Sequence, residues 1–545
     1  MKTELREYLE DILGFGEVVT GSREEEKLVE YIVSSLEEYV DSVATQRVPV
    51  MSWREKYAAV EVGGSSIKSA VLPYTLSFDC EAPLLYIRDI RDKKWRSAED
   101  KIVLVEFHRR DADFVEDYYV KAVEAGALGL IAFDYFQGVL RRIVVTGVKE
   151  YRRGCGEGPP PIPAVAVNRE AGVFLIKREG EKVRLYTEAY VRDSHGYNVE
   201  ASIYGKLEEE VLLTAHHDHW FSGAADNCLG VSLVIVASRH FSEKRLKRTL
   251  KLVSFTAEES GAPCFSSYYW TWGSRVYTES RDISKIYSVV NTDVLARGRL
   301  KLSASGVDYA KFAEEIIGIP AELDTSYMDS YSFSSKGVPS LSLHTLEDYM
   351  DYYHTDRDLP ENLDWSVVEK GVAAAFRLVE ELAVRGSGID SSAWRTTIRE
   401  LSVKLNIRLE SREIDRRLAK RLTASMVYAY DEHYPDERPA FLKTDVFPEL
   451  KIIEDFSKLK KARSLIENGD LRSALGLVAS IPLRIRLGDG KKMLSINTKP
   501  IMIYLEKRRV KEALLILEQL LSLEEKYIGE VRETLQEKLS SIVEE

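Results

Sequence analysis

Residues 211–231 read VLLTAHHDHWFSGAADNCLGV, and they join the end of an apolar run to a dense group of polar side chains. Val211–Leu213 is typical of the end of a buried strand. Three of the nine histidines then fall within four positions, and an apolar helix pattern follows from Leu229. A strand that ends in imidazoles and carboxylates before a helix indicates a metal site at the carboxyl edge of an α/β sheet. The alternative is a surface loop that is rich in histidine.

Further metal-binding side chains follow other strand-like runs later in the chain. Three such runs are Leu250–Ala257, Ile286–Thr292 and Val338–Leu343. The first is followed by Glu258 and Glu259, the second by Asp293, and the third by a loop, DYYHTDRD, that contains His354. In a parallel sheet all carboxyl ends lie at one edge, so we expect these side chains to converge there.

The candidate ligands are two imidazoles and three carboxylates, which are too many for one tetrahedral zinc ion. They are His216, Asp226, Glu259, Asp293 and His354. They suit two divalent metals if Asp226 bridges and each metal also takes one histidine and one other carboxylate. Glu258 is then left over, and a carboxylate beside the ligands is what hydrolysis needs as a general base. Zinc is favoured by the mixed nitrogen and oxygen ligands, while cobalt or manganese could occupy the same site.

With these motifs the chain resembles the co-catalytic di-zinc peptidases, a family that includes bacterial leucyl aminopeptidases and glutamate carboxypeptidase II. The family pattern of H-x-D, G-x-x-D-N, E-E, N-x-D and a late H-T is read here, in the same order, as AHHDHW, GAADN, AEESG, VVNTDV and YYHTDRD. The resemblance implies an α/β fold with a mixed, mostly parallel sheet flanked by helices. It also implies a peptide substrate and a dinuclear zinc site.

The resemblance also implies a role for each matched residue. Asp226 would bridge the metals, and His216 and Glu259 or Asp293 would lie on separate metals. His354 would complete the second metal, and Glu258 would be the base. Asp218 would orient His216 from outside the ligand set, and the Tyr353 hydroxyl would help to stabilise the oxyanion. The family also implies a cis peptide bond at Asp226–Asn227, whereas His217 and His219 are interpreted as packing residues.

The chain is long enough for several domains, and its pattern changes three times. Residues 1–48 are expected to be helical, with a capping box at Ser22 and Glu25. Residues 49–193 alternate short strand-like runs with turns around one helix at Phe114–Ala125, and they resemble an inserted protease-associated domain. Residues 194–385 are the expected catalytic domain. Residues 386–545 show apolar spacing of three and four, which predicts a helical domain. Such a domain supports dimerisation in glutamate carboxypeptidase II and transferrin receptor.

Bulk composition excludes several classes of partner. The net charge is −12 and there is no basic block, which argues against nucleic acid and anionic membranes. The amino terminus lacks the apolar segment of a signal peptide and no run is long enough to span a membrane, so we expect a cytoplasmic protein. The four cysteines are too scattered for a disulfide framework or a CxxC zinc motif. They are Cys80, Cys155, Cys228 and Cys264. Cys228 and Cys264 are close in sequence to the ligand motifs, and we interpret them as small buried residues; the alternative is a position near the metals.

The sequence therefore predicts a di-zinc metallopeptidase, most simply an aminopeptidase. A carboxypeptidase is an alternative that needs a cationic pocket, for which Arg297 and Arg357 are the candidates near the ligand motifs. A glutaminyl-cyclase-like acyl transferase would share the fold but use one zinc. A non-catalytic receptor would be expected to lack ligands, yet all five and the base are present.

Overall fold

The computed structural model describes most of the first 395 residues and two later segments. The described residues are 2–90, 92–107, 115–145, 158–266, 268–324, 327–395, 399, 419–420, 448–481, 498–522, 529 and 533. The candidate site lies wholly within them. Cys155 and the charged tail that begins at Glu524 lie largely outside them, so the predictions made for those positions stay predictions.

The strands join in one sheet with the order β1-β2-β6-β5-β4-β3-β7-β9-β8-β10-β13-β11-β12. Its metal-bearing half is built on four parallel neighbours, which are β9 (Arg248–Phe255), β8 (Leu207–His216), β10 (Ile286–Thr292) and β13 (Ser340–His344). β7 (Lys182–Ile203) pairs antiparallel with β9, and β11 (Lys301–Ala304) pairs antiparallel with β13. β12 (Ala321–Leu323) completes that edge. The predicted convergence of strand ends at one edge is therefore present.

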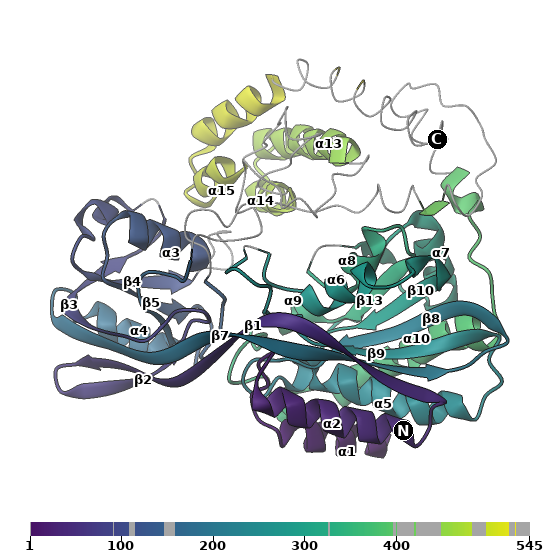
Figure 1. The fold of residues 1–545 in the computed structure, drawn as a ribbon. Coiled ribbons are helices and arrows are strands. Elements are labelled where there is room, and N and C mark those ends of the chain that lie inside the picture. Colours follow the sequence, from purple (N-terminus) through teal and green to yellow (C-terminus); the bar gives the residue numbers. More distant parts are fainter. Residues whose placement is uncertain are drawn as a thin grey trace.

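Helices cover both faces of this half of the sheet (Figure 1). A large apolar core packs four helices on one face: α1 (Lys2–Leu13), α2 (Arg23–Glu37), α5 (Leu229–Ser242) and α10 (Trp365–Val379). A smaller core packs α6 (Trp272–Glu279) and α8 (Ser330–Ser334) on the other. α7 (Val307–Ile317) also buries Tyr309 and Ala313 in the large core. The short helices are α9 (Leu346–Tyr349) and the one-turn segments Ile283–Lys285, Pro360–Asn362 and Glu380–Val384.

The amino-terminal prediction holds in part. The Ser22 side chain caps α2 by accepting from the Glu25 amide, as a capping box requires. The Glu25 carboxylate, however, accepts from the Gly21 amide. The expectation of helix to residue 48 is wrong, because β1 begins at Ser42. Residues 42–48 pair with β7, and tertiary pairing of this kind overrides a helical reading of the local sequence.

The insert forms the other half of the sheet and has apolar cores of its own. Its remaining strands are β2 (Ser65–Val71), β3 (Phe78–Ile87), β4 (Ile102–Phe107), β5 (Gly129–Asp134) and β6 (Ala164–Val167). Its helices are α3 (Val115–Glu124), α4 (Arg169–Ile176) and the turn Lys93–Ser97. β1 (Ser42–Val62) and β7 run unbroken from one half to the other and pair along almost their whole length (Figure 1). The predicted divisions after residues 48 and 193 thus cross continuous strands instead of linkers.

The described helices of the C-terminal segment are α13 (Pro448–Glu467), α14 (Leu471–Ala479), α15 (Lys499–Glu506) and a helix over 510–522. Their buried apolar side chains pack against one another. The predicted packing of these described helices on the catalytic domain is therefore wrong, whereas the predicted dimer contact stays a prediction. Four buried positions recur 39 residues later: Ala462 and Ile501, Ile466 and Leu505, Ala474 and Ala513, Val478 and Leu517. Gly469 and Arg508, also 39 apart, both have left-handed backbone at the turn. The segment is thus a repeated helical hairpin, which explains its separate core.

Within the described residues, no helix is both long enough and apolar enough to span a membrane.

Candidate metal centre

The five predicted ligands come together at the carboxyl edge of the sheet. His216 is the last residue of β8 and lies opposite Phe255, the last residue of β9. Glu259 follows β9 and Asp293 follows β10 directly. Four ligand side chains are buried, namely His216, Asp226, Glu259 and Asp293, and His354 is partly buried in the loop after α9.

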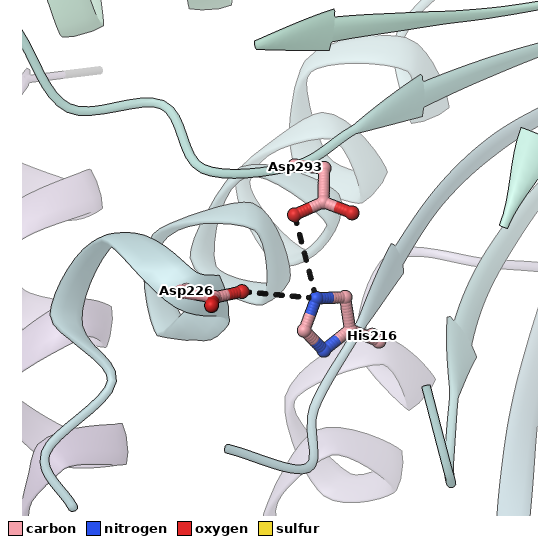
Figure 2. A group of neighbouring side chains, drawn as sticks. All are labelled: His216, Asp226 and Asp293. Carbon is pink, nitrogen blue, oxygen red and sulfur yellow. Dashed lines mark ion pairs between the residues drawn. The ribbon is translucent and has the colours of Figure 1, made fainter. Parts of the chain in front are cut away.

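One group consists of His216, Asp226 and Asp293 (Figure 2). Nε2 of His216 lies 3.3 Å from Oδ1 of Asp226 and 3.5 Å from Oδ1 of Asp293. The two carboxylates approach the same ring nitrogen from the helix side and the strand side. A single small cation at the centre would meet one nitrogen and two oxygens.

A second group consists of Asp226, Glu259 and His354. Nε2 of His354 lies 2.8 Å from Oε2 of Glu259 and 3.4 Å from Oδ2 of Asp226. The two oxygens of Asp226 therefore face different imidazoles, one in each group. Asp293 belongs with His216 and Glu259 with His354, a pairing that the sequence left open.

Hydrogen bonding shows that these residues fit cations. In the five ligand side chains, four buried atoms have no hydrogen-bond partner among the described residues, namely Nε2 of His216, Oδ2 of Asp226, Oε1 of Glu259 and Nε2 of His354. Buried polar atoms are normally paired, so a converging set of unpaired acceptors calls for an explanation. Divalent cations satisfy such atoms, and the nitrogen and oxygen donors suit zinc.

Electrostatics supports the same reading. Burial, followed by repulsion from Asp226 and Glu258, raises the pKa of Glu259 well above its usual range. Burial likewise raises the pKa of Asp293. For His216, burial alone would lower the pKa, but the nearby Asp293 and Glu258 raise it well above its ordinary value. The site thus concentrates negative charge that bound cations would neutralise.

Glu258 lies beside the ligands without belonging to either group. Its Oε2 is 3.9 Å from Nε2 of His216. Burial raises the pKa of Glu258 well above its usual range, and repulsion from Asp293 and Asp329 adds to the effect. A carboxylate with a raised pKa can accept a proton and give it back near neutral pH.

Asp218 supports the site differently from the role that the family implied. Its carboxylate accepts hydrogen bonds from the amides of Glu258, at 2.9 Å, and Glu259, at 3.0 Å. Its Oδ1 is 3.9 Å from Nδ1 of His216, whereas its backbone carbonyl lies 3.0 Å from that nitrogen. The carbonyl therefore orients the imidazole, and the carboxylate fixes the turn that carries both glutamates.

Asp358 is a supporting residue that sequence reasoning missed. Its carboxylate accepts from the amides of Ala225, at 2.8 Å, and Asp226, at 3.1 Å, and from the Tyr349 hydroxyl at 2.8 Å. It thereby holds the segment in which the Asp226–Asn227 peptide bond is cis, as predicted. In the sequence, Asp358 could have been recognised as the second acidic residue after His354 in the DYYHTDRD motif, a position to which no role was assigned.

Tyr353 lies against the second group. Its ring stacks on the His354 ring with centroids 3.7 Å apart. Burial raises the pKa of Tyr353 well above its usual range, and the charges of Asp226 and Glu259 add to the effect. The phenol therefore stays protonated and can act as a hydrogen-bond donor.

The remaining histidines of the first motif pack behind the site, as interpreted from the sequence. Nδ1 of His217 lies 2.8 Å from Oγ of Ser254, and Nε2 of His219 lies 2.9 Å from the Gly16 carbonyl. Among the cysteines, Cys228 is buried as expected, but Cys264 is exposed in the loop after the glutamates, so the expectation of burial is wrong there. A left-handed backbone at Cys264 turns that loop toward solvent.

The two arginines considered for a carboxypeptidase are engaged elsewhere. The Arg297 guanidinium pairs with Asp351 and lies over the Tyr352 ring. Arg357 is exposed, and its Nε lies 3.4 Å from the Gly138 carbonyl.

Comparison with known proteins agrees with this geometry. Residues 198–379 match the family model of peptidase family M28. Carboxypeptidase Q of Mus musculus is 25% identical over 401 residues, which cover 66% of this chain and 83% of that protein. A zinc aminopeptidase from Bacillus subtilis shares the fold with a TM-score of 0.57 and 18% identity, over 71% of this chain and 97% of that one. An aminopeptidase from Aneurinibacillus sp. strain AM-1 shares the fold with a TM-score of 0.52 and 19% identity, over 72% of this chain and 96% of that one. The predicted α/β fold is thereby confirmed, while the comparisons do not identify the insert.

Proposed function

We propose that this chain removes residues from the amino terminus of peptides, with two zinc ions as cofactors. The chain is a hydrolase, and its residues 198–379 match peptidase family M28. The observation that carries the proposal is the sharing of Asp226 between two ligand groups. A bridging carboxylate between two imidazole–carboxylate pairs is the arrangement of a two-metal hydrolase.

His216 and Asp293 would hold one ion, Glu259 and His354 the other, and Asp226 both. When bound, the ions supply Lewis acidity toward the scissile carbonyl and lower the pKa of the attacking water. Three ligand carboxylates against two divalent ions leave about one positive charge for the developing oxyanion.

The reaction itself would depend on groups outside the ligand set. Glu258 takes a proton from the attacking water and returns it to the leaving amine. Asp218 holds the Glu258 amide and so keeps that carboxylate beside the reacting atoms. The protonated Tyr353 hydroxyl donates to the oxygen of the tetrahedral species.

A carboxypeptidase is the second candidate, because the chain is similar to carboxypeptidase Q over 66% of its length. Recognition of a terminal carboxylate favours an available arginine. Arg297 pairs with Asp351, and Arg357 points to a carbonyl of the insert, so neither favours that reading. Asp329, a buried acidic group outside the ligand groups, favours a substrate with a free ammonium group.

Two finer features belong to the same proposal. The insert would act as a protease-associated domain that covers the site edge and restricts substrate length. The chain would also work as a cytoplasmic homodimer that assembles through its C-terminal helices.

The test is metal analysis of the purified protein combined with a matched panel of peptides. We expect two zinc ions per chain, cleavage of peptides with a free amino terminus, and no cleavage of their N-acetylated forms. Cleavage that instead requires a free carboxyl terminus would establish the carboxypeptidase. One zinc ion with cyclisation of N-terminal glutamine would establish the acyl transferase.

A further inference from the structure

His354 has a backbone conformation that needs support. Its φ is +59°, in the left-handed region that non-glycine residues rarely adopt. This conformation directs the ring to Glu259 and Asp226. Whatever stabilises it therefore also fixes the position of the Nε2 atom in the second group.

The support comes from the insert, in the segment that follows β5. Arg141 forms an antiparallel bridge with Thr355. The Arg142 amide donates to the His354 carbonyl at 2.9 Å, and the Asp356 amide donates to the Leu140 carbonyl at 3.0 Å. The loop that carries His354 is thus paired with a strand-like segment of the other half of the molecule.

The Arg141 side chain extends this contact to the residues before His354. Its guanidinium donates to the Tyr353 carbonyl and, at 3.0 Å, to the Met350 carbonyl. The third side of the guanidinium pairs with Asp134 at the end of β5. The Arg141 and Asp134 side chains are 8% and 4% exposed, so water does not compete for these bonds.

We propose that Arg141 is a positioning residue through which the insert holds His354 in place and completes the second metal-binding group. The carbonyls on both sides of the His354 backbone are held by the insert, one by the Arg141 side chain and one by the Arg142 amide. The recorded partners of His216 are Asp218, Asp226, Glu258 and Asp293, none of which belongs to the described part of the insert, and His216 ends a strand of the sheet itself. The inference rests on the proposed two-metal function and adds that only one of the two ions depends on the insert.

The experiment is a zinc titration of the full chain against a chromophoric chelator, for the unaltered protein, Arg141→Ala and Arg141→Lys. We expect Arg141→Ala to lower the affinity for one zinc ion about 10- to 100-fold, as is typical when support for a ligand is lost. The affinity for the other ion should be unchanged. Arg141→Lys should recover part of the loss, because an ammonium can reach one of the carbonyls but not all three partners. His354→Ala should weaken the same ion more strongly.

The matched control is Arg169→Ala. Arg169 also belongs to the insert and pairs with a carboxylate, Glu106, but its other contact is the Tyr135 ring. We expect unchanged binding of both ions. Since Arg141→Ala leaves Asp134 buried without its partner, the comparison is repeated in an Asp134→Asn background.

The outcomes separate the two proposals. If Arg141→Ala binds both ions as tightly as the unaltered protein does, the positioning role is overturned. It is also overturned if a folded Arg141→Ala variant loses the same affinity for each of the two ions. An unaltered protein that binds fewer than two ions would instead overturn the proposed function.

Discussion

At the scale of single residues, the two adjacent glutamates show how environment separates roles. Both lie in the turn after β9, and only Glu259 belongs to a ligand group. Glu259 meets His354 at 2.8 Å, whereas Glu258 lies 3.9 Å from His216. The amides of both are held by the same carboxylate, that of Asp218.

We predict that Glu258→Gln removes turnover and keeps both metals. The amide has nearly the shape of the carboxylate but cannot accept a proton, and general-base catalysis contributes a factor of about 10²–10⁴. Glu259→Gln should instead weaken the binding of one metal ion, because a neutral amide oxygen replaces an anionic carboxylate oxygen as the ligand. Metal content and peptide hydrolysis are measured for both. Loss of metal by Glu258→Gln alone would reverse the two roles, and full activity of that variant would refute the mechanism.

His344 predicts a pH dependence that is independent of the metals. Burial lowers its pKa from 6.5 to about 4, and its Nε2 lies 2.9 Å from Oγ of Ser303. The unfolded chain therefore binds more protons between these values, and stability falls as the pH falls through that window. Between roughly pH 7.5 and pH 5, the free energy of unfolding should fall by about 2 kcal/mol from this group.

Chemical unfolding of the chelated protein at both pH values checks this, with His344→Gln as the comparison. The variant should lose less stability on acidification by about that amount. An identical pH dependence in the two proteins would mean that His344 is not buried in its neutral form.

At the scale of elements, the first turn of α6 packs against the end of β9, from which the chain leads to the glutamates. A Cβ on Gly273 would lie 2.0 Å from the Thr256 carbonyl and 2.7 Å from Oδ1 of Asn198. Thr256 directly follows β9 and stands two residues before Glu258. Close approach of helix and strand end therefore requires glycine here.

We predict that Gly273→Ala destabilises the protein by about 1–3 kcal/mol, as overpacking does, and lowers activity by displacing the glutamates. The control is Gly476→Ala in α14, where a Cβ would meet nothing within 4 Å. That change should stabilise its helix by about 0.5–1 kcal/mol and leave activity unchanged. Thermal unfolding and peptide hydrolysis are compared, and an active, equally stable Gly273→Ala would contradict the packing argument.

At the scale of the whole molecule, the parts depend on one another unequally. The insert shares β1 and β7 with the metal-bearing half and contacts the His354 loop. The described C-terminal hairpins instead bury their apolar faces in a core of their own. Removal of the insert should therefore affect the site, whereas removal of the hairpins should not.

We predict that a chain ending at residue 445 binds both zinc ions and cleaves short peptides at nearly the full rate. If the proposed dimer assembles through the hairpins, sedimentation should show this shortened chain as a monomer. Loss of one or both ions would show that the C-terminal segment contributes to the centre. A shortened chain that remains a dimer would assign the dimer contact to another surface.

The convergence of the five proposed ligands could be predicted from the sequence, with Glu258 beside them. His216, Glu258, Glu259 and Asp293 stand at or just after a parallel strand, and carboxyl ends of parallel strands meet at one edge. Asp226 and His354 were found from the motifs that contain them. Apolar runs located β10 to the residue and β8, β9 and β13 to within a few residues, because buried parallel strands are nearly continuous apolar segments. Order along the chain was enough to propose which residues meet.

Only the tertiary structure decided how they meet. It paired His216 with Asp293 and Glu259 with His354, and it revealed the support of Asp358, Arg141 and the Asp218 carbonyl. It also turned residues 42–48 into a strand that joins both halves of the sheet. Most of these contacts join residues far apart in the chain, and all of them depend on backbone groups, register or packing that leave no periodic signal in the local sequence. The sequence therefore determined the chemistry of the site, and the fold determined its geometry.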